Sequence, residues 1–458
     1  MATAQIESGD APVPQGQLGF WTCTALVVGN TIGIGIFLLP SALAPFGFNA
    51  LMGWGVAVCG CVVLARVFAR LAQTMPEEDG PYSYIRRTQG AAPAFLSIWG
   101  YWVSVWVTNA TIAVGVVGYL QAAVPQLSAL GPTPLLALGL QWLFVLVNLM
   151  GLRAGGLVQI VTSALKLLPM AAIILLGLWL LISHPSLYAS HLPTTPIRLP
   201  QTMAAATIAL FAMLGLESAA VPAGRVRDPA RTIPRATVVG TLFTAAIYIA
   251  VSIIPMLLIP QTELARSPAP FVDLLNRFTG DGNGRWLAAF VVVSGLGALN
   301  GWTLLAGELT RSMAVNGVLP SVLSRVNRRG APLLGLLLTG ALASGMVLMN
   351  YSKSLVQGFT FLSIMVTAAC LPLYMFAALA LVALWRRGTR DLPKDLLVLG
   401  LLGAAYSIFS FVGAGAEPLF WTVVLAAAGL PIFFLMRWRQ PRPPSGAAVA
   451  EASAGGPP

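Results

Sequence analysis

Long apolar stretches follow one another along most of the chain, with short polar segments between them. About 20 consecutive apolar residues form a helix that can cross roughly 30 Å of hydrocarbon. Twelve such stretches are centred near residues 31, 60, 108, 142, 170, 213, 248, 299, 341, 370, 405 and 428. The pattern predicts an all-α polytopic membrane protein of about twelve transmembrane helices. Residues 1–17 and 440–458 are polar or rich in Pro and Gly, and are expected to be tails.

The first apolar stretch contains, near its centre, the run Gly29-Asn30-Thr31-Ile32-Gly33-Ile34-Gly35. Each Gly weakens a helix by about 1 kcal/mol relative to Ala, so the helix is expected to break here. Irregular backbone at membrane depth is tolerated only where it is buried in protein or lines a polar cavity. A broken helix near the bilayer midplane therefore predicts a binding site for a small zwitterion or ion, as in a transporter.

The sixth stretch has a comparable interruption at residues 210–218, which are again small and polar in the middle. Five spans over residues 18–183 and five over 202–384 then each begin with a discontinuous helix. This arrangement is typical of an inverted repeat whose substrate site lies where the two interruptions meet. The last two spans, 396–437, fall outside the repeat. The alternative is that the glycines only permit close helix packing, since Gly29 and Gly33 have small-xxx-small spacing.

Composition and charge agree with a membrane protein. The 458 residues are 57% hydrophobic and 9% charged, with a mean hydropathy of +0.81, which excludes a soluble domain. The net charge of +11 could suggest nucleic-acid binding, but the distribution of the charges along the chain indicates membrane topology instead. Most Lys and Arg fall on the side of the two termini or in buried positions, and those on the other side are Arg198, Arg266, Arg277, Arg285 and Lys353. The positive-inside rule then predicts a cell-membrane protein with both termini cytoplasmic, embedded in lipid and without a nucleic-acid partner.

Three charged residues stand out because charges inside a bilayer are costly and usually functional. Glu217 adjoins the second break and has no local partner, so it is expected to carry a proton or face a cationic substrate. Lys166 stands alone in span five, too deep to reach the interface easily. Its ammonium would replace a sodium ion, titrate to couple transport to protons, or be held in a fixed ion pair with Glu217 or by neighbouring carbonyls. Glu308 is three residues from Arg311, which predicts a structural ion pair.

The aromatic residues near span centres are candidates for a cavity wall. Most membrane tryptophans anchor the interface, but Trp302 and Phe211 lie near the middle of their spans. An aromatic ring can also hold a cation through its face. The four cysteines lie in apolar spans and are interpreted as small buried residues rather than as a disulfide or metal site. No metal or cofactor is therefore expected.

Four sequence motifs resemble the amino acid–polyamine–organocation superfamily, and specifically its basic amino acid/polyamine antiporter branch. They are Gly29-Asn30 with Gly33-x-Gly35-x-Phe37-Leu38-Leu39-Pro40, Tyr101-Trp102 with Asn109 and Gly118-Tyr119, Gly215-Leu216-Glu217-Ser218-Ala219, and Gly301-Trp302-Thr303-Leu304-Leu305-Ala306-Gly307. The resemblance runs from about residue 29 to 435. It implies the five-plus-five inverted repeat with discontinuous helices 1 and 6, two added helices, and often a homodimer.

The resemblance also implies roles for particular positions. The substrate ammonium would meet the carbonyls of Thr31, Phe211 and Leu214, and its carboxylate the amide of Gly35. The side-chain end of the substrate would face a set of span-three and span-eight residues: Ser104, Val105, Asn109, Ile112 and Trp302. Tyr101 would be a gating residue and Glu217 the proton-sensitive acid.

Three positions depart from the arginine/agmatine antiporter type of this branch. Ile34 replaces a carboxylate-binding serine, and Phe211 replaces a tryptophan. Lys166 instead resembles the span-five lysine of sodium-independent amino acid permeases and exchangers. The sequence therefore predicts a secondary amino acid or amine transporter, an exchanger or a proton-coupled permease working by alternating access, and leaves a neutral amino acid open as the substrate.

Two other classes of function were weighed against a transporter. An integral membrane enzyme needs a cluster of acids, histidines or a nucleophile with its base near one interface, and the sequence shows no such cluster. A channel usually gathers its pore-lining groups from several subunits, whereas this chain has a single set of helix breaks. Neither class fits the pattern as well as a transporter.

Overall fold

The computed structural model describes residues 19–75, 80–129, 131–151, 155–184, 186, 192–193, 195–215, 228–387 and 394–439. Among these, eight helices are long and apolar enough to span a membrane. They are α3 (Phe48–Thr74), α5 (Ala91–Ala123), α7 (Gly155–Ser183), α10 (Pro229–Leu258), α13 (Gly284–Val315), α15 (Leu355–Arg386), α16 (Asp395–Gly413) and α17 (Ala416–Arg439).

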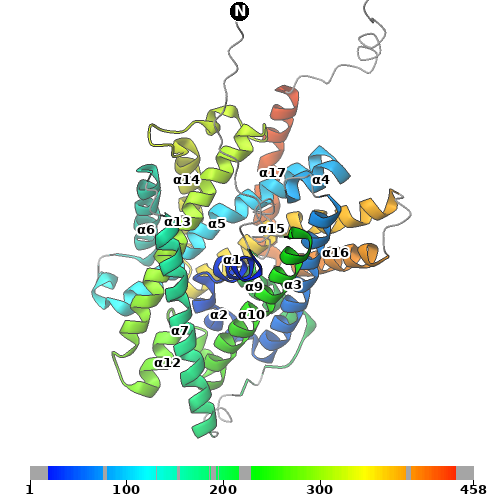
Figure 1. The fold of residues 1–458 in the computed structure, drawn as a ribbon. Coiled ribbons are helices and arrows are strands. Elements are labelled where there is room, and N and C mark those ends of the chain that lie inside the picture. The colour runs from blue at the N-terminus through cyan, green and yellow to red at the C-terminus, as the bar shows by residue number, and fades with distance from the viewer. Residues whose placement is uncertain are drawn as a thin grey trace, which may run out of the picture.

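Shorter apolar helices supply the remaining spans (Figure 1). They are α1 (Phe20–Thr31), α2 (Gly35–Leu43), α6 (Thr133–Leu149), α9 (Leu199–Ala212) and α14 (Leu333–Met349). Because α1 and α2 are two parts of one interrupted span, the set matches the predicted twelve. The predicted all-α polytopic membrane fold is confirmed. The two predicted tails and Glu217 lie outside the described residues.

Short helices connect the spans at both ends of the bundle. α4 (Pro81–Gln89) and the 3-10 turn η5 (Ser321–Ser324) lie at the end where α3, α13 and α15 finish. At the other end are α11 (Gln261–Leu264), α12 (Pro270–Thr279) and the 3-10 turns η1 (Ala44–Phe46) and η2 (Pro125–Ala129). We call these two ends the α4 side and the α12 side. In Figure 1 the α4 side is at the top and the α12 side at the bottom.

The contacts between helices are those expected of an inverted repeat, in which equivalent helices of the two halves make equivalent contacts. α1 packs against α10, and its counterpart α9 packs against α3. α5 packs against α15, and α13 packs against α7; likewise α5 meets α6 and α13 meets α14. Each contact in one half thus has its equivalent in the other. Close approach requires small residues: a Cβ added at Gly100 of α5 would lie 2.4 Å from the Ala369 carbonyl oxygen of α15.

Local signals explain several helix boundaries and one predicted ion pair. α15 begins with a capping box, in which the Ser354 hydroxyl accepts from the Gln357 amide at 3.3 Å. Such a cap satisfies amides that have no partner inside the helix. The predicted pair of Glu308 and Arg311 is confirmed, with Oε2 and Nε 2.9 Å apart. It lies on α13 near the α4 side, where both side chains are half-exposed, and is therefore structural.

Candidate functional site

The first helix break separates α1 from α2. α1 ends at Thr31, Ile32 leaves the helical region with ψ of 98°, and α2 starts at Gly35. At the start of α2 the Phe37 amide donates to the Ile34 carbonyl at 3.0 Å, whereas the Gly35 and Ile36 amides have no acceptor among the described residues, and no side chain caps the helix. At the other end of the break, the Thr31 carbonyl accepts a hydrogen bond from the Tyr248 hydroxyl at 2.8 Å. The break thus presents a positive helix end beside a negative one.

The second break follows α9 and faces the first. α9 ends at Ala212, and Gly215 has a φ of 99°, a left-handed conformation that favours glycine. The ring of Phe211 lies directly against the start of α2, since a Cβ added at Gly35 would be 2.5 Å from its Cε1 atom. The two interruptions therefore meet, as the repeat predicts. Residues 216–227, which continue this segment, are outside the described part of the chain.

A small cavity lies where the breaks meet. Nine of the predicted site residues line it: Thr31, Ile34, Gly35, Tyr101, Ser104, Ile112, Phe211, Leu214 and Trp302. They come from α1, α2, α5, α9 and α13, so helices far apart in the sequence converge on one space. The cavity is also lined by Gly33, Ala212 and Gly215, which belong to the two predicted breaks, and by residues to which the sequence assigned no site role: Ile36, Thr108, Tyr248, Val366 and Cys370.

Three other predicted site residues, Val105, Asn109 and Lys166, do not line this cavity. Val105 is fully buried on α5. The Asn109 amide links α5 to α13, donating to the Trp302 carbonyl at 3.4 Å and accepting from the Thr303 hydroxyl at 3.3 Å. Lys166 is only 2% exposed on α7, a helix that packs against α10 and α13. No ion-pair or hydrogen-bond partner for its ammonium is found in the described part of the chain.

The described lining of the cavity carries no charged side chain. Two of its hydroxyls already donate hydrogen bonds within α5. Ser104 donates to the Tyr101 carbonyl and Thr108 donates to the Ser104 carbonyl, both at 2.7 Å. The Thr31 hydroxyl is buried and has no partner among the described residues. Most of the polarity therefore comes from the helix ends, which suit a group with separate positive and negative ends. The described residues contain no cluster of metal-ligating side chains.

Aromatic packing closes the cavity toward the α12 side. The rings of Phe37 and Phe271 are 5.5 Å apart at their centroids, and those of Phe211 and Phe359 are 5.9 Å apart. The Tyr119 hydroxyl donates to the Phe37 carbonyl at 2.8 Å. Except for Phe211, which is 8% exposed, these side chains are fully buried.

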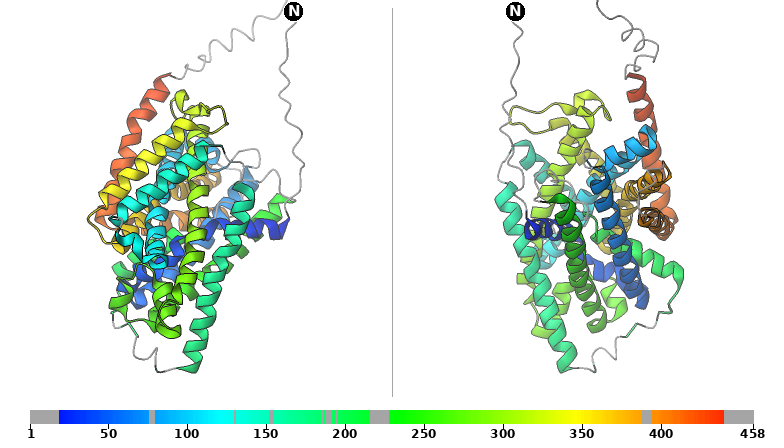
Figure 2. Two further views of the ribbon diagram at one scale, coloured as in Figure 1. Left: turned by 90° about the vertical axis from the view of Figure 1, so that its left-hand side faces the viewer. Right: turned by 45° about the vertical axis from the view of Figure 1, so that its right-hand side comes forward.

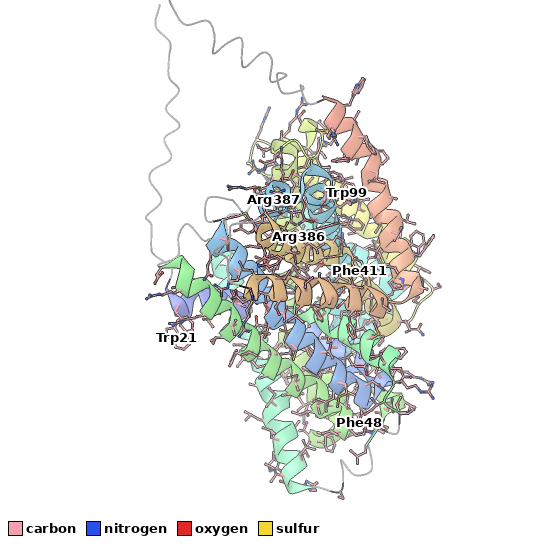
Figure 3. The ribbon with its side chains drawn as sticks, turned by 90° about the vertical axis from the view of Figure 1, so that its right-hand side faces the viewer. Trp21, Phe48, Trp99, Arg386, Arg387 and Phe411 are labelled. Atoms are coloured by element: carbon pink, nitrogen blue, oxygen red, sulfur yellow. The ribbon has the colours of Figure 1, made fainter. Side chains whose placement is uncertain are left out.

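The α4 side is open instead. A larger cavity of about 1700 Å³ lies between α4, α5, α13 and α15. Tyr101 lines both this cavity and the central one, so it stands between them. In Figure 1 α1 is seen almost end-on, whereas α7 and α13 run down the picture, so α1 is steeply inclined to them. Figure 2 shows α1 projecting from the bundle. Trp21 at its outer end, labelled in Figure 3, is 76% exposed.

Comparisons with known proteins agree with this geometry. Residues 18–436 match the family model described as amino acid permease. The chain belongs to that family. The permease is 32% identical to a putative arginine/ornithine antiporter of Bacillus subtilis (strain 168) over 452 residues, covering 91% of this chain and 95% of the relative. It is 29% identical to the cadaverine/lysine antiporter of Escherichia coli (strain K12), with 90% and 93% covered. It is 28% identical to the putrescine transporter PotE of the same organism, with 92% and 96% covered.

These relatives confirm the resemblance to the basic amino acid/polyamine antiporter branch of the superfamily. The permease is therefore a multi-pass cell-membrane transporter of the antiporter type and not an enzyme.

Proposed function

We propose that this permease exchanges one amino acid or amine for another across the cell membrane by alternating access. The observation that carries the proposal is the central cavity, in which the ends of two interrupted helices face each other. Free amides at the start of α2 suit a carboxylate, and carbonyls at the ends of α1 and α9 suit an ammonium group. An α-amino acid presents both groups at once.

The state of the structure follows from the charge distribution. The positive-inside rule places the α4 side, with both chain termini, in the cytoplasm. The cavity that opens past Tyr101 then leads to the cytoplasm, and the α12 side faces outward. The structure thus represents an inward-facing state, in which substrate enters or leaves from inside the cell.

The substrate proposed first is a basic amino acid or its amine, of the arginine or agmatine kind. Relatives that resemble the chain over nearly its whole length are named for arginine, ornithine, lysine, cadaverine and putrescine. The ammonium would bind the carbonyls of Thr31, Phe211 and Leu214, and the carboxylate the amide of Gly35. The side chain would then extend toward Trp302, whose ring can hold a cation through its face.

A neutral amino acid is the second candidate, and the described lining favours it. Besides carrying no carboxylate, the cavity presents Ile112 and Val366 where the substrate side chain would lie. Ile34 also has no hydroxyl to offer a polar group. A cationic side chain would lose its hydration on entering this site and find few charged groups to replace it. A neutral side chain would lose less hydration free energy.

Coupling is assigned to three residues. Tyr101, between the two cavities, would gate access from the cytoplasm. Glu217, next to the second break, would be the proton-sensitive acid. Lys166 would replace a bound cation or carry a proton, since its ammonium is buried and has no counter-ion among the described residues. A Glu217→Gln variant should then alter the pH profile of transport, and an unaltered profile would reduce Glu217 to a structural role.

Counterflow in liposomes tests the function and its substrate. Purified protein is reconstituted with unlabelled amino acid inside, and uptake of labelled arginine, lysine, putrescine and leucine is measured separately. Exchange dependent on the internal substrate is expected, and its absence across the panel would refute the proposal. Trp302→Ala should raise the half-saturation concentration for a cationic substrate roughly three- to thirty-fold, from a cation–π energy of about 0.5–2 kcal/mol. Trp286→Ala, which alters a tryptophan that is 77% exposed, is the control.

A further inference from the structure

A groove runs between α3 and α16 on the α4 side, away from the transport cavity. Its unfilled space is about 1040 Å³. The residues relevant here are Arg66, Arg70, Gln73, Asp395, Val398 and Leu402. Figure 3 faces this side of the molecule, with α16 lying across the bundle and Phe411 labelled toward its far end. Two arginines beside exposed apolar residues are unusual on a membrane-facing surface.

Helix lengths place this groove where lipid headgroups meet hydrocarbon. α3 has 27 residues, about 40 Å of helix, which exceeds the roughly 30 Å of hydrocarbon. Arg66 lies 18 residues after Phe48, or about 27 Å along the axis. Asp395, the first residue of α16, lies at a similar level because it pairs with Arg70, one turn beyond Arg66 on α3. Arg66 and Asp395 are therefore expected near the α4-side edge of the hydrocarbon, where lipid phosphates lie.

The two arginines differ in what they contact. Arg70 is already partnered: its Nη2 atom is 2.6 Å from Oδ2 of Asp395, and its Nη1 atom is 3.4 Å from Oε1 of Gln73. Arg66 is exposed, and its guanidinium has no ion-pair or hydrogen-bond partner among the described residues. Lys394, adjacent to Asp395, adds a further positive charge. The groove thus retains an uncompensated guanidinium at a depth where charges are costly unless paired.

Beyond Asp395, the α16 wall of the groove is apolar. Val398 is 55% exposed and Leu402 is 52% exposed, one and two turns further along α16 than Asp395. A free phosphate ion would contact only the arginine end and leave this wall uncovered. A phospholipid matches both parts, since its phosphate can pair with a guanidinium through two hydrogen bonds while its acyl chain lies along the apolar wall.

We propose that this groove binds one anionic phospholipid, with the lipid phosphate on Arg66 and an acyl chain against Val398 and Leu402. An anionic headgroup is required because a zwitterionic one supplies its own cation and leaves the positive groove uncompensated. The site is separate from substrate binding, so it stands or falls independently of the transport proposal.

Native mass spectrometry of the full-length protein in detergent, titrated with phosphatidylglycerol or phosphatidylcholine, tests this site. One phosphatidylglycerol should bind more tightly than phosphatidylcholine. Arg66→Gln should weaken its binding about five-fold, from about 1 kcal/mol per basic residue near an anionic lipid surface. Arg66→Lys should retain much of the affinity. Arg325→Gln removes the same charge from the exposed residue that follows η5, and should leave binding unchanged.

Three results would overturn the proposal. The first is equal affinity for the two lipids. The second is an equal loss in Arg66→Gln and Arg325→Gln, which would mean attraction to the overall charge of the surface. The third is competition by soluble glycerol phosphate at the lipid concentration, which would mean that the apolar wall contributes nothing. Thermal unfolding of each variant is measured alongside, so that a loss of lipid is not confused with a loss of fold.

Discussion

The two sides of the central cavity are built differently. On the α12 side, side chains bind backbone groups across helices: Gln261 donates to the Ala44 carbonyl at 2.8 Å, and Asn49 donates to the Pro196 carbonyl at 3.0 Å. These bonds join η1 to α11 and α3 to the segment before α9, while the aromatic layer joins α2 to α5 and α12, and α9 to α15. On the α4 side, α1 projects from the bundle beside an open cavity. The α4 side has such bonds too, from Gln89 to the Phe376 carbonyl at 2.6 Å and from Arg387 to the Thr88 carbonyl at 2.7 Å, but they join α4 to α15 and do not involve α1.

This difference indicates which parts must move. To open the α12 side, the permease must break directional hydrogen bonds and separate buried rings. To close the α4 side, it has only to bring α1 back toward the bundle and reposition Tyr101. A substrate that binds both helix breaks would favour that movement, because α1 and α2 meet at the binding site. Four substitutions test this comparison, from the largest expected effect to the smallest.

Gly35→Ala should abolish most transport. The added methyl carbon would lie 2.5 Å from Cε1 of Phe211, so the ring must leave its position over the start of α2. We expect at least a ten-fold loss of exchange in liposomes, corresponding to about 1.4 kcal/mol or more. The control is Gly55→Ala on α3, where no atom lies within 4 Å of an added Cβ. Adding Phe211→Leu to Gly35→Ala should restore part of the activity, and no restoration would contradict the steric explanation.

Lys166→Met should reduce transport while making the protein more stable. The change replaces a buried ammonium, which has no partner among the described residues, with an apolar side chain of similar length. Removing an uncompensated buried charge is favourable, so the midpoint of thermal unfolding should rise by about 2 °C or more. Lower stability together with lost transport would show that Lys166 is a structural residue. Unchanged transport would remove it from coupling.

The twelve spans and the first break could be predicted from the sequence because both are local. A run of apolar residues predicts a membrane span, and the glycines at positions 29, 33 and 35 predict a weak helix. Neither prediction needs the rest of the fold. The pair of Glu308 and Arg311 was equally accessible, since it lies within one turn of one helix. Family motifs then indicated which side chains near the breaks line the cavity.

Other contacts depend on how helices are rotated, which one sequence does not determine. Tyr248 lies between Ile247 and Ile249 in a uniformly apolar run, so nothing marks it as the donor to the Thr31 carbonyl. On α5 the cavity-lining residues Tyr101, Ser104, Thr108 and Ile112 follow one helical face. Val105 and Asn109 are their direct neighbours in sequence but lie beside that face, where Asn109 links two helices.

Tyr119→Phe should loosen the α12 side without disturbing the α4 side. It removes one buried hydrogen bond, to the Phe37 carbonyl, worth about 1 kcal/mol. The population open toward α12 should then increase about five-fold. The measurement is alkylation of a cysteine placed at Ser363, which shares a face of α15 with Phe359 and Val366, in a background without the four native cysteines. Tyr351→Phe, at a tyrosine that is 51% exposed, is the control. Equal alkylation rates in the two variants would mean that this bond does not hold the seal.

Asp273→Asn should remove a small pH dependence from the α12 side. Asp273 lies in the first turn of α12, outside the spans, and accepts a hydrogen bond from the Ser267 hydroxyl. Burial raises the pKa of its carboxyl above the ordinary value of 3.8, and the nearby Glu263 carboxylate adds to this, while the Ser267 hydrogen bond and Arg277 oppose it. Tyr119 on α5 also faces this carboxyl.

A carboxyl whose pKa is raised by folding binds more protons in the native than in the unfolded state, so it stabilises the native state increasingly as pH falls from neutral through the raised pKa toward about 4. The Asp273 carboxyl should therefore raise the unfolding temperature slightly in mild acid relative to neutral pH. Asp273→Asn should remove that increment. Asp281→Asn, at an exposed position in the next loop, should leave the slope unchanged. If Asp273→Asn and Asp281→Asn both give the pH profile of unfolding of the unmodified protein, protonation of Asp273 does not contribute to the stability of the native state.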